Sequence, residues 1–535
     1  MNEPTLKTLP RLIEKGVARG GELTILGRDR SRAVTRSHQE LYEEAGRVAP
    51  GLVEEGIRPG DRIGVIGETS HRFVVALLGV WRAGATVVLL PERGQRSTSA
   101  WAAYLRERLA SVTARGVLSM GEQLPMDLGV PAIEISDAGQ RDPVTVDVGL
   151  DSLATILFTS GTTAEPKAIP ITLERYGHTD RLRRSFTSMS GPEHHLFWWS
   201  PLHTGLSFHR ALVHPLLTGS SLTYLPPRYV IAEPLRWLTE IADRGVTHSG
   251  GPGFGFEMVT RAIRNEAPPN IDLTSWEECA MVGERIDPQI LEAFFDATTP
   301  MGLTRDAFVS TYACSEVAVI TTGISKRGLW VDHVDPDALM KGDATPTSST
   351  NSASFVSVGP VIDGIDMRIL DEHGKEVGER EVGEVFVRAP GMMTNYIGAE
   401  GKIDWFATHD RAYTVESEVF LIGRLEELVI VRGNNMSLIG IESALRSTLP
   451  DDVSPYALGV RIASADEIVI VLGTAEGPQD GELETNVRRE LWRRLSISPH
   501  DVVTIADREI PRSAGKFERA ELKRRYLAGE LVDAR

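Results

Sequence analysis

Between residues 37 and 90 the sequence alternates helical patterns with short, almost uninterrupted apolar runs, and this alternation limits the fold more than any other feature. The segment SHQELYEEAG places Ser37 and Glu40 in the spacing of a capping box, followed by apolar residues at helical intervals. Apolar strands are predicted at residues 63–66 and 85–90, separated by a helix that ends at Gly84. This pattern predicts a parallel sheet covered by helices on both faces.

The alternation continues to about residue 320, and the pattern then changes. Residues 341–354, KGDATPTSSTNSAS, are small and polar and predict a loop. β-hairpins follow, with Gly374 in a turn, and beyond Gly423 three apolar strands surround an amphipathic helix at residues 483–495. We expect a mixed α/β and α+β protein. A large N-terminal domain, residues 1–422, has mixed sheets covered by helices and a β-rich end, and residues 423–535 form a small mobile α+β lid.

Composition narrows the class of protein. A chain of 535 residues exceeds the size of a single core, and a formal net charge of −17 argues against a nucleic-acid partner. The two cysteines are too few for a disulfide framework or a zinc cluster. The first residues lack the apolar core of a signal peptide, and Arg82 interrupts the most apolar stretch. We expect a cytoplasmic protein without a membrane span.

The segment LFTSGTTAEPKAI, residues 157–169, combines hydroxyl side chains, a glycine and Lys167. Backbone amides in such a turn form an anion-binding nest, and a lysine adds charge, so the segment suits a triphosphate. It is not a Walker A loop, because Ala168 follows the lysine. Composition alone is more typical of a polar surface turn.

Five segments together resemble the adenylate-forming superfamily, which contains acyl-CoA synthetases, luciferases, peptide-synthetase adenylation domains and fatty acyl-AMP ligases. TSGTTAEPK resembles its phosphate loop, YACSE (312–316) its YG-x-[TA]-E element and THDRAY (408–413) its TGD element. GRLEELVIVRGNNMSLIGIE (423–442) resembles its hinge signature, and PRSAGKFER (511–519) its C-terminal lysine motif. The order of the five segments over the whole length makes coincidence improbable.

Three other segments are similar to the fatty acyl-AMP ligase branch. They are THSGGPGFGFEMVTRAI (247–263), IDLTSWEECAMVGERI (271–286) and GLWVDHVDPDALMKGDATPTSS (328–349). The last resembles an extra segment that, in that branch, hinders the domain rotation needed for thioester formation with CoA. The resemblance therefore implies that the acyl-adenylate goes to an acyl carrier protein instead of CoA.

The resemblance also implies roles for particular residues, with ATP and Mg²⁺ as cofactors and a carboxylic acid as substrate. Lys516 would bridge the carboxylate and the α-phosphate, Glu316 would ligate Mg²⁺, Tyr312 would stack on adenine and Asp410 would receive the ribose hydroxyls. The plainer alternatives are a solvated lysine, a surface glutamate and a core tyrosine. The implied catalytic residues are Lys516 and Glu316, with Glu316 also the metal ligand; the ATP-binding residues are Thr159, Ser160, Gly161, Thr162, Thr163, Lys167, Gly283, Glu284, Tyr312, Ser315, Asp410 and Arg424; the candidate acid pocket contains His203, Thr204 and Gly251.

Among the departures of the sequence from the family pattern, two concern the predicted site. PLHTGLSF (201–208) stands where PLYHDMGL is usual, which puts the usual fatty acyl substrate in doubt, and His409 replaces a glycine of the TGD element. The expected function is ATP- and Mg²⁺-dependent formation of an acyl-AMP from a carboxylic acid, with a fatty acid as the expected substrate, in lipid, polyketide or lipopeptide biosynthesis. The alternatives are an acyl-CoA synthetase, an enzyme that adenylates a small or aromatic acid in specialised metabolism, and a non-catalytic nucleotide-binding protein.

Overall fold

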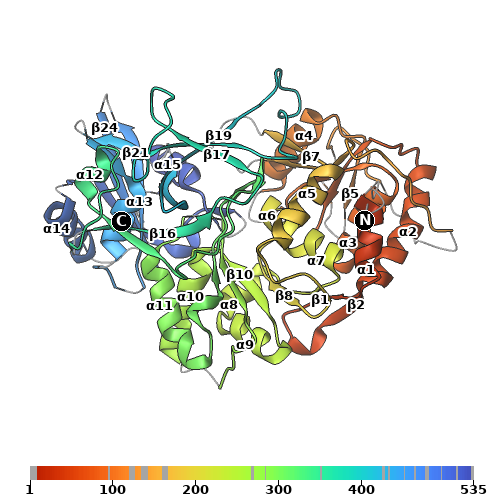
Figure 1. The fold of residues 1–535 in the computed structure, drawn as a ribbon, viewed down its shortest axis with the longest axis horizontal. Helices are drawn as coiled ribbons and strands as arrows, with labels where there is room; N and C mark the ends of the chain where they lie inside the picture. The colour runs from red at the N-terminus through yellow and green to blue at the C-terminus, as the bar shows by residue number, and fades with distance from the viewer. Residues whose placement is uncertain are drawn as a thin grey trace.

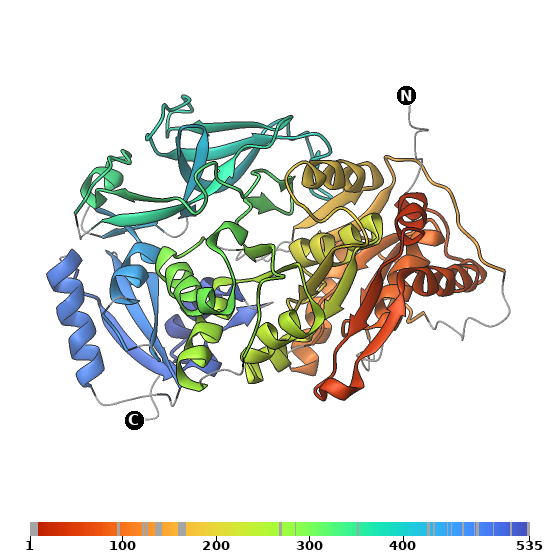
Figure 2. The same ribbon diagram turned by 60° about the horizontal axis from the view of Figure 1, so that its bottom comes forward.

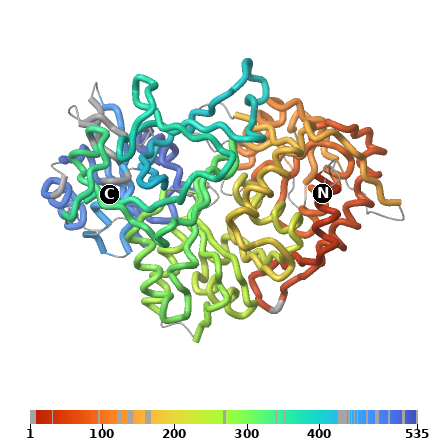
Figure 3. Tube along the Cα trace, in the orientation of Figure 1, coloured from red at the N-terminus to blue at the C-terminus, as the bar shows by residue number. Residues whose placement is uncertain are grey.

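The structure is a computed structural model in which the chain runs from one end of an elongated molecule to the other (Figures 1 and 3). The N-terminal helices lie at the opposite end from the C-terminal unit, and the β-rich segment spans the top between them (Figure 2). The residues described are 9–531, without 94–96, 120–123, 125–126, 134–141, 159–166, 267–269, 284, 350–351, 425–427, 432–433, 447, 451, 463–464, 476, 478–480, 496 and 514–515.

The predicted parallel sheet near the N-terminus is confirmed. Its strand order is β5 (Gly116–Ser119), β3 (Arg62–Ile66), β4 (Thr86–Leu89), β6 (Leu153–Phe158) and β7 (Ala168–Thr172), and only the β6–β7 pair is antiparallel. Val87 packs in one buried cluster with α3 (His71–Arg82), while Val88 packs in another with α4 (Thr98–Ser111). Helices therefore cover both faces, as the apolar pattern predicts.

The predicted capping box is also present. α2 (His38–Glu54) begins after Ser37, whose side chain accepts a hydrogen bond from the backbone N–H of Glu40, while the Glu40 side chain accepts one from the backbone N–H of Ser37. α3 ends at Arg82, two residues before Gly84, which adopts a φ of 77°. The local signals of capping residue and glycine thus set both helix boundaries.

A second sheet stands beside the first. Its order is β12 (Phe308–Val309), β11 (Glu278–Met281), β10 (His248–Gly251), β8 (His195–Trp198), β9 (Ser221–Tyr224), β1 (Glu22–Ile25) and β2 (Val34–Ser37), and every pair except β1–β2 is parallel. Its helices are α8 (Pro227–Ala232), α9 (Leu235–Arg244), α10 (Gly253–Glu266) and α11 (Pro288–Thr298).

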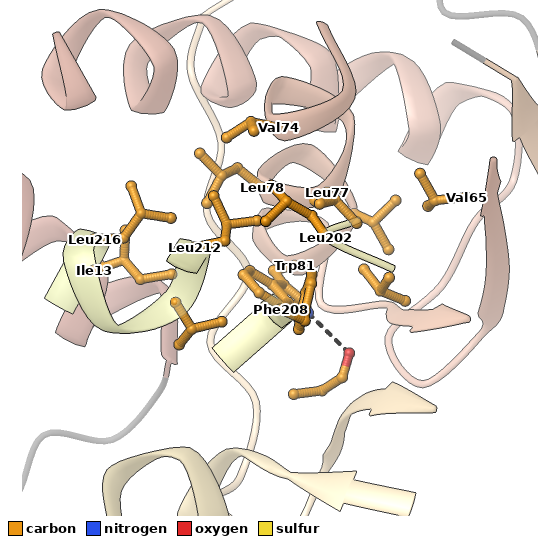
Figure 4. Close-up of a cluster of buried hydrophobic side chains, with 14 of the residues drawn as sticks. Ile13, Val65, Val74, Leu77, Leu78, Trp81, Leu202, Phe208, Leu212 and Leu216 are labelled. Atoms are coloured by element: carbon orange, nitrogen blue, oxygen red, sulfur yellow. Dashed lines mark hydrogen bonds between the residues drawn. The ribbon is translucent and has the colours of Figure 1, made fainter. Parts of the chain in front are cut away.

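A large apolar core lies between the two sheets (Figure 4). It joins α1 (Leu9–Val17), α2 and α3 to one continuous helical run made of α6 (Gly205–Ser207), the π-helix η2 (Phe208–Val213) and α7 (His214–Thr218). Trp81 meets the edge of Phe208 at 5.8 Å between ring centroids, and its indole N–H donates to the Ala154 carbonyl at 2.8 Å. This core fixes the position of η2, which lines the cavity described below.

The β-rich end predicted after residue 320 is a third sheet. Its order is β15 (Val331–Val334), β16 (Ala353–Pro360), β20 (Glu418–Arg424), β19 (Phe406–Val415), β18 (Gly383–Arg388) and β17 (Asp366–Leu370), all antiparallel. Gly374 lies between β17 and β18 with a φ of 77°, as expected of a turn. α12 (Pro336–Met340) precedes the predicted polar loop, of which the described residues up to 352 contain no strand or helix after α12.

The last part of the chain is the predicted α+β unit. β23 (Ser454–Ile462), β24 (Ala465–Thr474) and β25 (Asp501–Ala506) form its sheet, and α13 (Leu438–Arg446) and α14 (Glu482–Leu495) pack together. The remaining elements are β21 (Leu428–Val431), β22 (Asn434–Ser437), β26 (Arg512–Ser513), β27 (Lys516–Phe517) and α15 (Arg519–Leu527). The predicted boundary at residue 423 falls at the end of β20. Within the described residues, no helix combines the length and the apolar character that a membrane span requires.

Candidate functional site

A cavity of about 1480 Å³ lies where the N-terminal sheets, the β-rich sheet and the C-terminal unit meet. Its lining combines residues from all three parts of the chain. Nine of the predicted site residues line it: Lys167, His203, Thr204, Gly283, Tyr312, Ser315, Glu316, Asp410 and Arg424. Six others lie outside the described residues: Thr159, Ser160, Gly161, Thr162, Thr163 and Glu284. The structure thus brings together residues that are up to 257 positions apart, from Lys167 to Arg424.

Three residues from different sequence motifs form one hydrogen-bonded chain in this cavity. The Tyr312 hydroxyl donates to Asp410 Oδ2 at 2.6 Å, and Arg424 Nε donates to Asp410 Oδ1 at 3.3 Å. Asp410 and Arg424 face each other because β19 and β20 pair in that register. Burial raises the pKa of Asp410, although Tyr312 and Arg424 oppose that shift, and burial next to Asp410 raises the pKa of Tyr312 well above its ordinary value. At neutral pH the tyrosine is therefore a hydrogen-bond donor.

Glu316 follows the short strand β13 (Ala313–Cys314) and lines the same cavity. The Tyr396 hydroxyl donates to Glu316 Oε1 at 3.1 Å. The Lys167 ammonium group lies 5.2 Å from the centroid of the same tyrosine ring, within cation–π range. Arg175 Nη2 donates to the Ser315 carbonyl at 2.5 Å. We call the part of the cavity lined by Lys167, Tyr312, Glu316, Asp410 and Arg424 the motif end.

The strained position in this end is His409, which replaces a glycine of the expected element. Its φ of 61° lies in the left-handed region, where glycine has no steric cost and other residues are uncommon. The imidazole Nδ1 is 2.9 Å from Glu384 Oε1 on β18, and the exposed His409 is itself among the residues that line the cavity. The turn therefore keeps the left-handed backbone that a glycine would adopt and still aims Asp410 at Tyr312.

The predicted phosphate loop, residues 159–166, connects β6 to β7 and lies outside the described residues. Its two flanks are described, and both contribute to the cavity through Phe158 and Lys167. Because β6 and β7 are paired antiparallel neighbours, Phe158 opposite Ala168, both ends of the loop are fixed at the cavity edge.

Lys516 is placed through its backbone alone, in the hairpin of β26 and β27, and its side chain lies outside the described residues. The neighbouring residues Arg512, Phe517 and Arg519 all line the cavity. Arg446 joins this unit to the rest of the chain, since its Nη1 is 2.9 Å from Glu257 Oε1 and its Nε is 3.5 Å from Asp287 Oδ2. These ion pairs fix the unit over the cavity in the conformation of the structure.

Gly251 is not among the residues that line the cavity, and its assignment to the acid pocket stays a prediction. It ends the buried strand β10, where a Cβ atom would lie 2.7 Å from the Trp199 ring. A glycine is required at this position because the Trp199 ring leaves no room for a side chain. The next residues along the chain, Pro252, Gly253 and Phe254, do line the cavity.

The sequence analysis missed the polar residues that line the cavity from α5 (Leu173–Arg184) and η2. Arg175, Thr179 and Arg183 are spaced four residues apart on α5, so they share one face of that helix, and all three line the cavity. His209 and Arg210 line it from η2, beside Trp198. We call the part lined by Arg183, His209, Arg210 and Trp198 the helical end.

A network of buried charges supports the helical end. Arg210 forms an ion pair with Glu278, whose Oε2 also accepts a hydrogen bond from the Thr187 hydroxyl at 2.6 Å. Burial raises the pKa of Glu278, but Arg210, His248 and Arg183 outweigh burial and hold that pKa well below its ordinary range. The carboxylate is therefore ionised at neutral pH and balances one of the two buried arginines.

One feature of the sequence is consistent with the helical end, although it does not specify it. The segment LERYGHTDRLRR has almost no apolar stripe, yet α5 is a partly buried helix beside β7. A helix that is polar on its inward face lines a polar cavity or an ion-pair network. To apply this rule to α5, one must know which face of the helix points inward. That face is set by how α5 packs against the sheets.

Comparison with known proteins gives a family match. The family model described as AMP-binding enzyme matches residues 14–397. A putative ligase of Mycobacterium tuberculosis is 26% identical over 514 residues, covering 90% of this chain and 93% of that protein. The medium-chain-fatty-acid–[acyl-carrier-protein] ligase of Moorena producens is 26% identical over 538 residues, covering 92% of this chain and 90% of that protein.

Solved structures share the fold. A structure from a study of fatty acyl-adenylate ligases from E. coli and L. pneumophila superposes with a TM-score of 0.87 at 23% identity, covering 98% of this chain and 99% of that one. A second, the McyG A-PCP protein in complex with phenylalanyl-adenylate, superposes with a TM-score of 0.84 at 20% identity, covering 99% and 97%. At these identities the likeness concerns the fold, which includes both the large N-terminal part and the small C-terminal unit.

Proposed function

The chain belongs to the AMP-binding enzyme family, and from that premise we propose that it activates a carboxylic acid with ATP to form an acyl-adenylate, which it passes to the thiol of a carrier protein. In the first step a carboxylate oxygen bonds to the α-phosphorus of ATP, the bond from that phosphorus to the β-phosphate oxygen breaks, and pyrophosphate leaves. Both reactants are anionic, so positioning and charge cancellation supply most of the catalysis.

The observation that carries this proposal is the motif end of the cavity. An ionised aspartate can accept two hydrogen bonds at once, which suits the two ribose hydroxyls, and Asp410 is already oriented by Tyr312 and Arg424. The same cavity contains the Lys167 cation at the edge of the phosphate loop and the Glu316 carboxylate. A nucleotide bound there would place its ribose at Asp410 and its phosphates near Lys167 and Glu316.

Glu316 fits the requirements of a magnesium ligand. Mg²⁺ prefers oxygen ligands and is usually held by one or two carboxylates together with substrate phosphates. Tyr396 orients one carboxylate oxygen of Glu316 within the cavity. A bound Mg²⁺ would supply charge neutralisation on the phosphate oxygens. Lys516, on the hairpin beside Phe517, would bring a compact positive charge to the carboxylate and the α-phosphate.

The choice of a carrier protein over CoA rests on the segment 328–349. In the structure this segment contains β15 and α12, and α12 contacts β22 of the C-terminal unit. A contact of this kind opposes rotation of the unit to a second orientation. The Moorena producens relative carries an acyl-carrier-protein acceptor in its name, which is consistent with this choice.

Mass spectrometry of the protein incubated with ATP, Mg²⁺, CoA and a panel of acids tests both steps. We expect one acyl-adenylate to accumulate despite the presence of CoA, and to be consumed when a carrier protein with its phosphopantetheine arm is added. Appearance of acyl-CoA would instead identify an acyl-CoA synthetase. In the Lys516→Ala variant we expect adenylate formation to be lost while ATP binding persists, and full turnover by that variant would contradict the proposal.

A further inference from the structure

The helical end of the cavity is lined by charged side chains that are themselves buried. Arg183 and Arg210 are each 2% exposed, and both line the cavity together with His209. An acid pocket built for a long apolar chain would be lined by apolar side chains at this depth. Here the buried lining includes the guanidinium groups of Arg183 and Arg210 instead.

Several nitrogen atoms of these side chains lack a hydrogen-bond partner. Arg183 Nε, Arg210 Nε and His209 Nε2 are buried and have no partner among the described residues. The neighbouring hydroxyls are satisfied, because Tyr176 donates to Thr155 and Thr179 donates to the Arg175 carbonyl. Buried polar groups without partners are rare and costly, so the unmatched nitrogens indicate that something outside the chain satisfies them.

The charges of the helical end do not balance. Arg183 and Arg210 supply two positive charges, and Glu278 supplies one negative charge that is in contact with Arg210. The nearby Asp180 is already engaged by His214 at 2.9 Å and Arg184 at 2.8 Å. In the described part of the chain no carboxylate forms an ion pair with Arg183. Burial lowers the pKa of Arg183 to about 9, so the group remains positive at neutral pH.

We propose that the acid activated by this protein carries a second oxygen-rich group at its far end, best a second carboxylate, and that Arg183 binds this group with help from Arg210 and His209. The inference rests on the proposed function, since it assigns the substrate class of the same cavity. A second carboxylate would neutralise the excess positive charge and accept hydrogen bonds in the fork geometry that arginine offers.

The helical run that carries these residues also limits the length of the acid. Gly205 lies against Ser315, since a Cβ atom built on it would be 2.8 Å from Ser315 Oγ, so the run begins beside Glu316. Arg210 is five residues further along. At the α-helical rise of about 1.5 Å per residue, which the wider π-helical turn does not exceed, the two positions are at most roughly 7 Å apart along the axis. A group reached by Arg210 from the motif end therefore belongs to a short acid.

The decisive experiment compares pairs of acids of equal length, a monocarboxylate and the corresponding dicarboxylate, by pyrophosphate release in the presence of ATP and Mg²⁺. For the wild-type protein we expect the dicarboxylates to have the higher kcat/KM. In Arg183→Met we expect kcat/KM for the dicarboxylates to fall about tenfold to a hundredfold, the effect of losing a hydrogen bond to a charged group, while the monocarboxylates change little or improve.

Thermal stability provides the second readout, and it separates substrate binding from a structural role. Arg183→Met removes a buried charge that makes no ion-pair contact with a described carboxylate and lies beside the positive Arg210, so we expect Tm to stay equal or to rise while activity toward dicarboxylates falls. Arg183→Lys should keep part of the dicarboxylate preference because it keeps the charge. Arg181→Met is the matched control, since Arg181 is an exposed arginine on the same helix, and it should change neither quantity.

The outcomes distinguish this inference from the proposed function. The inference is overturned if the wild type prefers monocarboxylates and Arg183→Met leaves that preference unchanged. Pyrophosphate release in the same experiment would still uphold the proposed function. A fall in Tm of Arg183→Met with equal loss toward both acids also overturns it, because the arginine is then structural. If no acid leads to pyrophosphate release, the proposed function fails. In that case the inference is still supported if calorimetry shows binding of a dicarboxylate to the wild type that is lost in Arg183→Met. Absence of such binding would overturn both.

Discussion

At the motif end of the cavity the polar side chains satisfy one another, whereas at the helical end several buried nitrogen atoms have no partner among the described residues. Asp410 accepts from Tyr312 and Arg424, and Glu316 accepts from Tyr396. Arg183 and His209 present unmatched nitrogens. Residues that partner one another keep their geometry without a ligand, while unmatched groups select a ligand that completes them. Under the two proposals above, the motif end would position ATP and the helical end would discriminate among acids.

The largest expected effect comes from removing the charge of the motif end. Glu316→Gln keeps the shape and the contact with Tyr396 but loses the carboxylate, so we expect pyrophosphate release to fall about a thousandfold. Glu372→Gln, at an exposed glutamate, is the matched control and should retain the wild-type rate. An unchanged rate in Glu316→Gln would remove the reason for assigning the metal to this end.

Breaking the charge network below the helical end should destabilise the fold. Glu278→Gln leaves Arg210 buried without its carboxylate, and we expect the free energy of unfolding to fall by about 3–5 kcal/mol. Urea denaturation measures this change. Arg183→Met sharpens the comparison, because removing the excess arginine should not destabilise the protein. Equal destabilisation by both variants would mean that the two arginines have the same role.

Acid should weaken the helical end before the motif end. Burial lowers the pKa of His248 to about 4, below the ordinary value of 6.5, although the facing Glu278 opposes the shift. The unfolded chain therefore binds more protons, and the stability that the neutral imidazole contributes is present above pH 6.5 and is lost as the pH falls toward 4. We expect this loss to reach about 3 kcal/mol at most. In His248→Gln, urea unfolding should show a shallower pH dependence between these values, and an identical dependence would contradict the assignment.

Within the motif end, the two partners of one hydrogen bond should differ in importance. Asp410→Asn weakens an acceptor intended for two ligand hydroxyls, so we expect KM for ATP to rise about tenfold to a hundredfold. Tyr312→Phe removes only the orienting donor and should raise KM by less. The steady-state kinetics of both variants measure this difference. A larger effect of Tyr312→Phe would place the phenol, instead of the carboxylate, in direct contact with the nucleotide.

The smallest effect is expected at His409. Substitution by glycine relieves the left-handed backbone strain, which stabilises the protein, and removes the contact with Glu384, which destabilises it. The two terms are similar in size, so the free energy of unfolding should change by less than about 1 kcal/mol. Thermal unfolding measures the sum, and Glu384→Gln isolates the contribution of the contact. A loss well above this range would show that the imidazole supports the site in another way.

The sequence predicted the motif end well because its residues lie in short segments whose chemistry is local. Asp410 and Arg424, for example, lie in adjacent strands whose pairing brings them together. Local signals also predicted parts of the fold outside the cavity, as at Ser37 and Glu40, which set the start of α2. Membership of the adenylate-forming family, expected from five short segments, is confirmed by the family match. The roles of all the named site residues stay predictions, and the side chains of Lys516, Glu284 and residues 159–163 also lie outside the described residues.

The helical end could not be predicted because no local pattern specifies it. Arg183 and Arg210 belong to different helices, and they meet only after two sheets pack around a shared core. The close approach of Gly251 to the Trp199 ring is likewise not visible in its sequence neighbourhood. Such features depend on long-range packing, which periodicity and composition do not encode.

The π-helical conformation of η2 bears on how the substrate preference of the cavity can change in evolution. A π-helical turn closes through i→i+5 hydrogen bonds and holds about one residue more than an α-helical turn, and Phe208, His209 and Arg210 of this π-helix all line the cavity. Deletion of one residue would restore α-helical spacing and rotate part of this set away from the acid. Substrate preference at this site is therefore open to alteration through insertion and deletion, and homologues that differ by a single residue in length here would be expected to diverge in the acids they accept.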